Sequence, residues 1–201
     1  MATLDYGTSA YNRSRGNLPE LPVINMFVEK SPADGVVMQS HRALKAAATV
    51  GNGPVRQTLK KDGVFGGDRF SVSGNGFYRN DALVGVIDGS GVTYIVASDS
   101  EVVVGRGNTA YSYNGSNFQA IAFPDGAAVT MVSYTAGYFI FLRSGTGKWY
   151  FSAVGNARSI DALDFATAEN EPDALLDVAV LDGVLIFLGT ESVGFWGATG
   201  D

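Results

Sequence analysis

The chain has 201 residues, which suits one all-β domain or one domain with an arm, and 46% hydrophobic against 17% charged residues allow a sizeable core. The absence of cysteine excludes disulfides and thiolate chemistry. The net charge of −6 disfavours a surface that grips DNA phosphates, although an acidic wall past which DNA slides is compatible with it.

The first 54 residues differ from the rest, because they lack clean alternation and hold four of the six prolines: Pro19, Pro22, Pro32 and Pro54. Proline fixes φ and removes a backbone donor, so we expect residues 1–54 to form an extended N-terminal arm. Only the short segment 41–48 has helix-forming composition. We expect residues 1–50 to pack on something beyond their own propeller, with an apolar anchor such as Ile24, Met26 or Phe27 buried against a neighbour or the blades.

No signal peptide or membrane anchor is expected, since the N-terminus lacks an apolar core region and no apolar run is long enough to span a bilayer.

From Val55 onward, strand signals alternate with turn signals. The whole chain contains 26 glycines, a number that turn-rich β folds need and long helices tolerate poorly. Asp-Gly or Asn-Gly pairs, which accept positive φ, occur at 62–63, 75–76, 88–89, 114–115, 125–126 and 182–183. Short β-branched and aromatic runs lie between them, at 69–72, 92–96, 129–134, 138–142 and 184–188.

A loose repeat runs through this part of the chain, in which a hydrophobic strand is followed closely by an aromatic strand. The first strands of the four units start at residues 69, 101, 138 and 184. This spacing resembles that of β-propeller blades, which take roughly 40–50 residues each. We therefore predict an all-β fold: an arm over 1–54, then a partial β-propeller of about three to four blades over 55–201.

The last unit supplies three strands, at 178–181, 184–188 and 193–196, whereas a complete blade has four. The predicted blades therefore continue beyond residue 201. We also expect the isolated chain to self-associate, because its last sheet leaves an unpaired edge and an uncovered apolar face.

The segment from Ile160 to Val178 contains a specific pattern of residues. Asp164-Phe165, Glu169 and Pro172-Asp173 stand before a hydrophobic strand, and Gly189 and Trp196 follow it. This arrangement resembles a motif of the packaged-DNA stabilisation family, the tail-hub or nozzle proteins of short-tailed phages. Asn25 and Glu29 resemble the opening of that family, and Arg56 resembles its start of the first blade.

The resemblance implies a structural virion protein and not an enzyme. It implies a homo-oligomeric ring, a hexamer in this family, that extends the DNA exit channel below the portal and adaptor and carries a needle, plug or fibres. Packaged DNA would pass through without sequence-specific binding, and no cofactor is implied. The motif or interface candidates are Asn25, Glu29, Arg56, Asp164, Phe165, Glu169, Pro172, Asp173, Gly189 and Trp196.

Catalytic and metal-binding interpretations find little support in the residues. His41 is the single histidine, and it lies in the arm, away from any strand-end cluster. The acidic residues between 161 and 177 lack EF-hand spacing, so turns and caps explain them better than a calcium site or a glycosidase carboxylate pair. The alternative functions are a propeller glycosidase, a carbohydrate-binding domain and a generic propeller scaffold.

Overall fold

The computed structural model describes residues 26–31, 35–40, 46, 48–126, 128–167 and 173–197. The chain divides into two compact units, residues 1–47 and 48–201. In the first unit, β1 (Met26–Ser31) pairs with β2 (Gly35–Ser40) as an antiparallel hairpin. The sequence analysis did not predict this hairpin, and most of the segment with helix-forming composition at 41–48 lies outside the described residues.

The described residues of the second unit form four antiparallel sheets, each a meander of consecutive strands, which we call blades 1 to 4. Blade 1 has β3 (Val55–Lys60), β4 (Arg69–Ser73), β5 (Gly76–Arg79) and β6 (Ala82–Val86). Blade 2 has β7 (Thr93–Ala97), β8 (Val102–Arg106), β9 (Thr109–Tyr113) and β10 (Phe118–Ala120). Blade 3 has β11 (Val129–Thr135), β12 (Tyr138–Arg143), β13 (Lys148–Phe151) and β14 (Phe165–Thr167). Blade 4 has β15 (Leu175–Leu181), β16 (Val184–Gly189) and β17 (Val193–Gly197) among the described residues.

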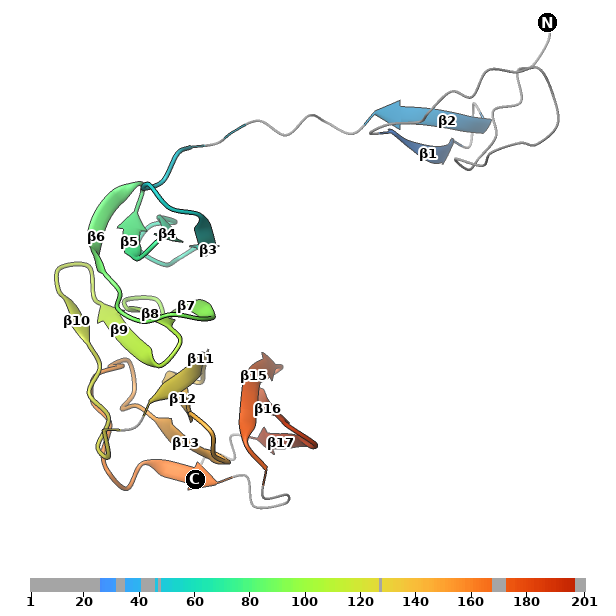
Figure 1. Ribbon diagram of the computed structural model, residues 1–201. Helices are drawn as coiled ribbons and strands as arrows, with labels where there is room; N and C mark the ends of the chain where they lie inside the picture. The colour runs from blue at the N-terminus through green and yellow to red at the C-terminus, as the bar shows by residue number, and fades with distance from the viewer. Residues whose placement is uncertain are drawn as a thin grey trace, which may run out of the picture. The chain divides into compact units, whose positions relative to one another are not determined.

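The blades follow one another in an arc, with their first strands on its inner side (Figure 1). The first strand of each blade contacts the first strand of the next: β3 contacts β7, β7 contacts β11, and β11 contacts β15. This is the arrangement of a partial β-propeller, and it confirms the predicted fold class. The predicted repeat corresponds to the second and third strands of each blade.

Three apolar clusters fill the spaces between consecutive blades. The second strands supply much of each cluster, because their alternate residues point to opposite neighbours. In β12, Phe139 and Phe141 pack against blade 2, whereas Ile140 and Leu142 pack against blade 4. Each such side chain contributes about 1.5–3 kcal/mol when it is fully buried, which explains why these strands are apolar on both faces.

The two end faces of the arc differ in chemistry. The free face of blade 4 exposes four large apolar side chains: Leu181 at 62%, Leu188 at 39%, Val193 at 55% and Phe195 at 70%. The corresponding face of blade 1 is polar and covered along β4, where Ser71 and Ser73 alternate with Phe70 and Val72 and all four side chains are buried. Ser73 also donates to the Gly53 carbonyl at 2.8 Å, so the chain before β3 packs on this face.

Candidate functional site

Asp173 closes the tight connection between β16 and β17. The backbone N–H groups of Glu191 and Ser192 donate to its Oδ2 at 2.8 Å and 3.1 Å, and the Ser192 hydroxyl donates to its Oδ1 at 3.0 Å. The bond from Glu191 contributes most to holding the pKa of Asp173 below its usual range. The carboxylate therefore serves as an anionic cap for backbone donors that no strand partner satisfies.

Gly189, the last residue of β16, lies directly against this carboxylate. A Cβ built at Gly189 would overlap the carboxylate oxygens of Asp173, so only glycine leaves room for the cap. The backbone also closes the turn, because Gly189 N–H donates to the Ser192 carbonyl at 2.8 Å. Two of the candidate motif residues, distant in the sequence, thus form one structural unit.

Trp196 lies on β17 opposite Leu185 and faces blade 3. Its ring meets Trp149 of β13 edge to face, with ring centroids 5.8 Å apart and an interplanar angle of 80°. Trp149 in turn stacks on Phe187 at 5.2 Å. This aromatic group joins blades 3 and 4.

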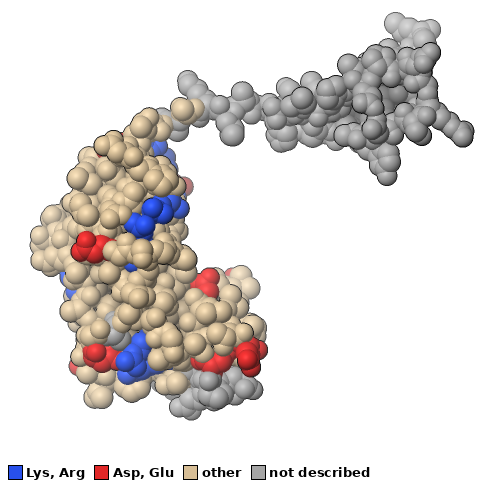
Figure 2. Space-filling view, viewed as in Figure 1, with Lys and Arg blue, Asp and Glu red and all other residues tan. Residues whose placement is uncertain are grey.

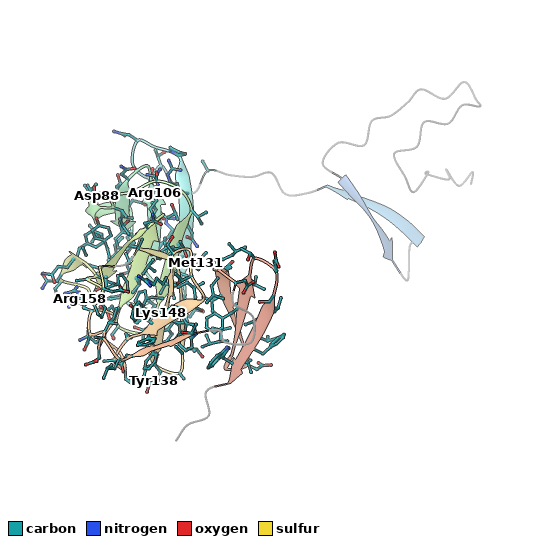
Figure 3. The ribbon with its side chains drawn as sticks, turned by 60° about the horizontal axis from the view of Figure 1, so that its bottom comes forward. Asp88, Arg106, Met131, Tyr138, Lys148 and Arg158 are labelled. Atoms are coloured by element: carbon teal, nitrogen blue, oxygen red, sulfur yellow. The ribbon has the colours of Figure 1, made fainter. Side chains whose placement is uncertain are left out.

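Asp164 and Phe165 lie at the outer edge of blade 3, where β14 begins. The Asp164 carbonyl accepts a bond from Phe151 N–H at 3.1 Å and so starts the pairing of β14 with β13. The Lys148 ammonium lies 3.8 Å from the centroid of the Phe165 ring, a favourable cation–π geometry. Figure 3 labels Lys148 on this blade.

The remaining candidates lie elsewhere in the chain. Arg56 is on β3 of blade 1, where its Nε donates to the Gly74 carbonyl at 3.1 Å. Glu29 lies on β1 opposite Val37. Asn25, Glu169 and Pro172 lie outside the described residues. The structure thus brings together Asp173 and Gly189 but does not join all the candidates in one site.

A polar hollow of about 460 Å³ lies between blades 2 and 3, and the sequence analysis did not identify it. Its lining includes Ser100, Glu101, Asn114, Asn156 and Arg158. Glu101 is only 5% exposed, and its Oε2 accepts a bond from Ala157 N–H at 2.8 Å. No sequence signal marks this glutamate, because its partner is a backbone group in the following blade.

Arg158 makes a second link between these blades. Its Nε donates to the Ser112 hydroxyl at 2.6 Å, and its Nη1 donates to Gln119 Oε1 at 2.8 Å. Within the described residues, no group of three or more His, Cys, Asp or Glu side chains is placed to hold a metal ion. Chemically, the hollow offers hydrogen-bonding groups that hold two blades together.

The described residues contain no helix with the length and apolarity needed to cross a membrane. No curated protein matches the chain. Among solved structures, a computationally designed protein named Ika8 is 13% identical, with a TM-score of 0.53, over 88% of this chain and 56% of that one.

Two natural proteins show the same degree of likeness. BamB from Moraxella catarrhalis is 12% identical with a TM-score of 0.51, over 72% of this chain and 44% of that one. The Swd1 β-propeller domain of Myceliophteria thermophila is 10% identical with a TM-score of 0.50, over 72% and 54%. The chain spans about half the length of these structures. At such identities the likeness shows the fold alone.

The family comparison is more specific. The model of a phage stabilisation family, described as bacteriophage P22 Gp10, β-propeller, matches residues 9–201. That range covers nearly the whole chain and includes the segment between Ile160 and Trp196 that carries the motif. The chain belongs to the P22 Gp10-like family of phage DNA stabilisation proteins.

Proposed function

We propose that this protein forms part of the tail hub, or nozzle, of a short-tailed phage. In this role, a ring of identical subunits extends and closes the DNA exit channel below the portal and adaptor. The ring holds the packaged DNA and lets it pass at ejection. The family match over residues 9–201 is the observation that carries the proposal.

Charge supports a channel component more than a DNA-gripping protein. The net charge is −6, and a protein that neutralises many phosphates needs a basic surface instead. On the visible face of blades 1 to 4, charged residues occur in small scattered groups of both signs (Figure 2). A face without a broad basic patch is what we expect of a component that DNA passes without being held.

The partners follow from the proposed place in the virion. We propose a homo-oligomeric ring, a hexamer, that meets the portal adaptor on one side and a needle, plug or fibres on the other. The part of the arm that precedes residue 48, where the second compact unit begins, would pack on a neighbour in this assembly. The exposed apolar side chains on blade 4, such as Leu181 and Phe195, are candidate contacts within it.

The polar hollow is a poor basis for the glycosidase alternative. Glycoside hydrolysis ordinarily needs two carboxyl groups on opposite sides of the sugar bond. Glu101 is the one carboxylate among the described residues that line the hollow, and Ala157 N–H already engages it. We therefore propose a structural role without turnover.

DNA retention tests the proposal. Phage particles assembled without the protein should package DNA and then lose it, so nuclease-resistant DNA per head should fall. Supplying the protein to such heads before nuclease treatment should restore retention. Heads that keep their full DNA content without the protein would overturn the proposed function.

A further inference from the structure

The chain contains three Asn-Gly pairs, at 52–53, 75–76 and 114–115. Asparagine loses its side-chain amide most readily before glycine, because glycine has no Cβ to hinder the approach of its backbone nitrogen. The reaction makes two demands on a fold. The asparagine side chain must be free to turn towards the next residue, and the backbone of that residue must be free to meet it. The structure treats the three pairs differently.

The pair at 75–76 is held between two blades. The Asn75 Oδ1 atom accepts a hydrogen bond from Nη1 of Arg106 in blade 2. Gly76 lies opposite Ser73 in the ladder between β4 and β5, which fixes its backbone. The Asn75 side chain would have to leave Arg106 and the strand would have to open before the two groups could react.

The pair at 114–115 is held within its own turn. The Asn114 Oδ1 atom accepts hydrogen bonds from the N–H groups of Ser116 at 3.2 Å and Asn117 at 2.8 Å. Asparagine commonly uses its side chain in this way to close a turn. Both bonds must break before the Asn114 side chain can turn towards the nitrogen of Gly115.

The pair at 52–53 has no such restraint. Asn52 is exposed in a bend, and within the described part of the chain neither its side chain nor the Gly53 N–H makes a hydrogen bond. The glycines on either side are packed instead: a Cβ at Gly51 would overlap the Tyr78 hydroxyl, and one at Gly53 would overlap the backbone of Gly74. The bend therefore rests on blade 1 while the Asn52 amide stays in solvent.

We propose that Asn52 is a site of spontaneous modification, where the side chain deamidates through a cyclic imide formed with Gly53. The Gly53 nitrogen bonds to Asn52 Cγ, and the side-chain amine takes the Gly53 N–H proton and leaves as ammonia. Water then opens the ring at either carbonyl carbon, which gives aspartate or isoaspartate. Water is the only other reactant. The proposal goes beyond the proposed function, because it concerns the chemistry of the chain whether or not the protein forms a ring.

Isoaspartate at position 52 would loosen the chain that leads into blade 1. This product adds one CH₂ group to the main chain between residues 52 and 53. The bend has little room for it, since Gly53 lies directly against Gly74 and its carbonyl accepts a bond from the Ser73 hydroxyl at 2.8 Å. The longer backbone displaces Gly53 from both contacts.

Peptide mass spectrometry of the full chain, held in mildly alkaline buffer, tests the site. We expect the mass gain of deamidation to appear at Asn52 at least tenfold faster than at Asn75 or Asn114. In urea the three pairs should react at similar rates, because the fold no longer protects two of them. Asn52→Ser should remove the gain from its peptide alone. Equal rates at the three pairs of the folded chain, or a slower rate at Asn52, would overturn the proposal.

Hydrogen exchange over residues 48–54 tests the structural consequence. Exchange should be faster in aged protein that contains isoaspartate than in fresh protein. Asn52→Asp is the matched control, because it adds the negative charge without the CH₂ group, and it should exchange like fresh protein. Unchanged exchange in the isoaspartate form, or equally fast exchange in Asn52→Asp, would contradict the effect assigned to the longer backbone.

Discussion

The Asp173 carboxylate lies directly over the bare backbone of Gly189, where a Cβ would overlap it. This contact explains why the motif has aspartate at position 173 and glycine at position 189. Glycine makes room for the carboxylate, and the carboxylate satisfies the N–H groups of Glu191 and Ser192 that the turn leaves free. These two motif residues therefore stabilise the turn between β16 and β17 of blade 4.

Gly189→Ala is expected to destabilise the protein, by about 1–3 kcal/mol, because the added methyl group displaces the cap. Urea unfolding of the two proteins measures the loss. Gly194→Ala is the matched control in the same blade, since its Cβ would meet only Trp196 Nε1 at 3.9 Å. Equal stability of the Gly189 variant and the parent protein would show that the close approach is not required.

Asp173 also predicts a pH dependence. Its pKa is lowered in the folded state from 3.8, chiefly by the bond from Glu191 N–H, so its contribution to stability is present above pH 3.8. That contribution disappears as the pH falls from 3.8 through the folded-state pKa. The stability difference between the protein and Asp173→Asn should therefore be constant near neutral pH and shrink in acid.

Unfolding free energies at a series of pH values provide the test. Asp68 in blade 1 also has a lowered pKa, through bonds from Asn80 and Arg79, but both proteins retain it and its effect cancels. A stability difference that stays the same across the acid range would contradict the role assigned to the Asp173 charge.

Glu101 should stabilise the folded protein because its side-chain oxygen accepts the hydrogen bond from Ala157 N–H. Glu101→Ala leaves the buried Ala157 N–H without its partner, which costs about 1–3 kcal/mol. Glu101→Gln keeps a carbonyl oxygen of similar reach and should lose less. Thermal unfolding of the three proteins gives the order, and a glutamine variant as unstable as the alanine variant would mean that the charge itself is needed.

The free face of blade 4 should make the isolated chain self-associate, because contiguous exposed apolar side chains favour association. Phe195→Lys should reduce the association, since Phe195 is the most exposed of the large apolar residues on that face. Sedimentation at several concentrations measures it. A stable monomer of the unmodified chain would contradict this prediction.

The blades could be predicted from the sequence because their second strands are apolar on both faces and their third strands are aromatic. Residues 138–142 were predicted as a strand, and β12 spans Tyr138–Arg143. Turns were less predictable. Asp182-Gly183 forms a two-residue turn with positive φ at both positions, as its sequence indicates. The Asn75-Gly76 pair does not, because Gly74 takes the positive φ and Gly76 begins β5.

Contacts between residues far apart in the chain could not be predicted from the sequence. The motif residues Asp173 and Gly189 could be named from a resemblance, but their contact depends on how β15 and β16 pair. The link from Glu101 to Ala157 N–H joins residues in different blades, and a backbone donor leaves no mark in the sequence.

Electron microscopy of the phage tail, with the protein marked by a bound antibody fragment, tests the central claim most directly. The account predicts a closed ring of copies around the DNA exit channel, directly below the portal and adaptor. Its blades should form propellers in the ring wall. A tail that lacks the protein, or a position on fibres away from the channel, would contradict the proposed tail-hub function.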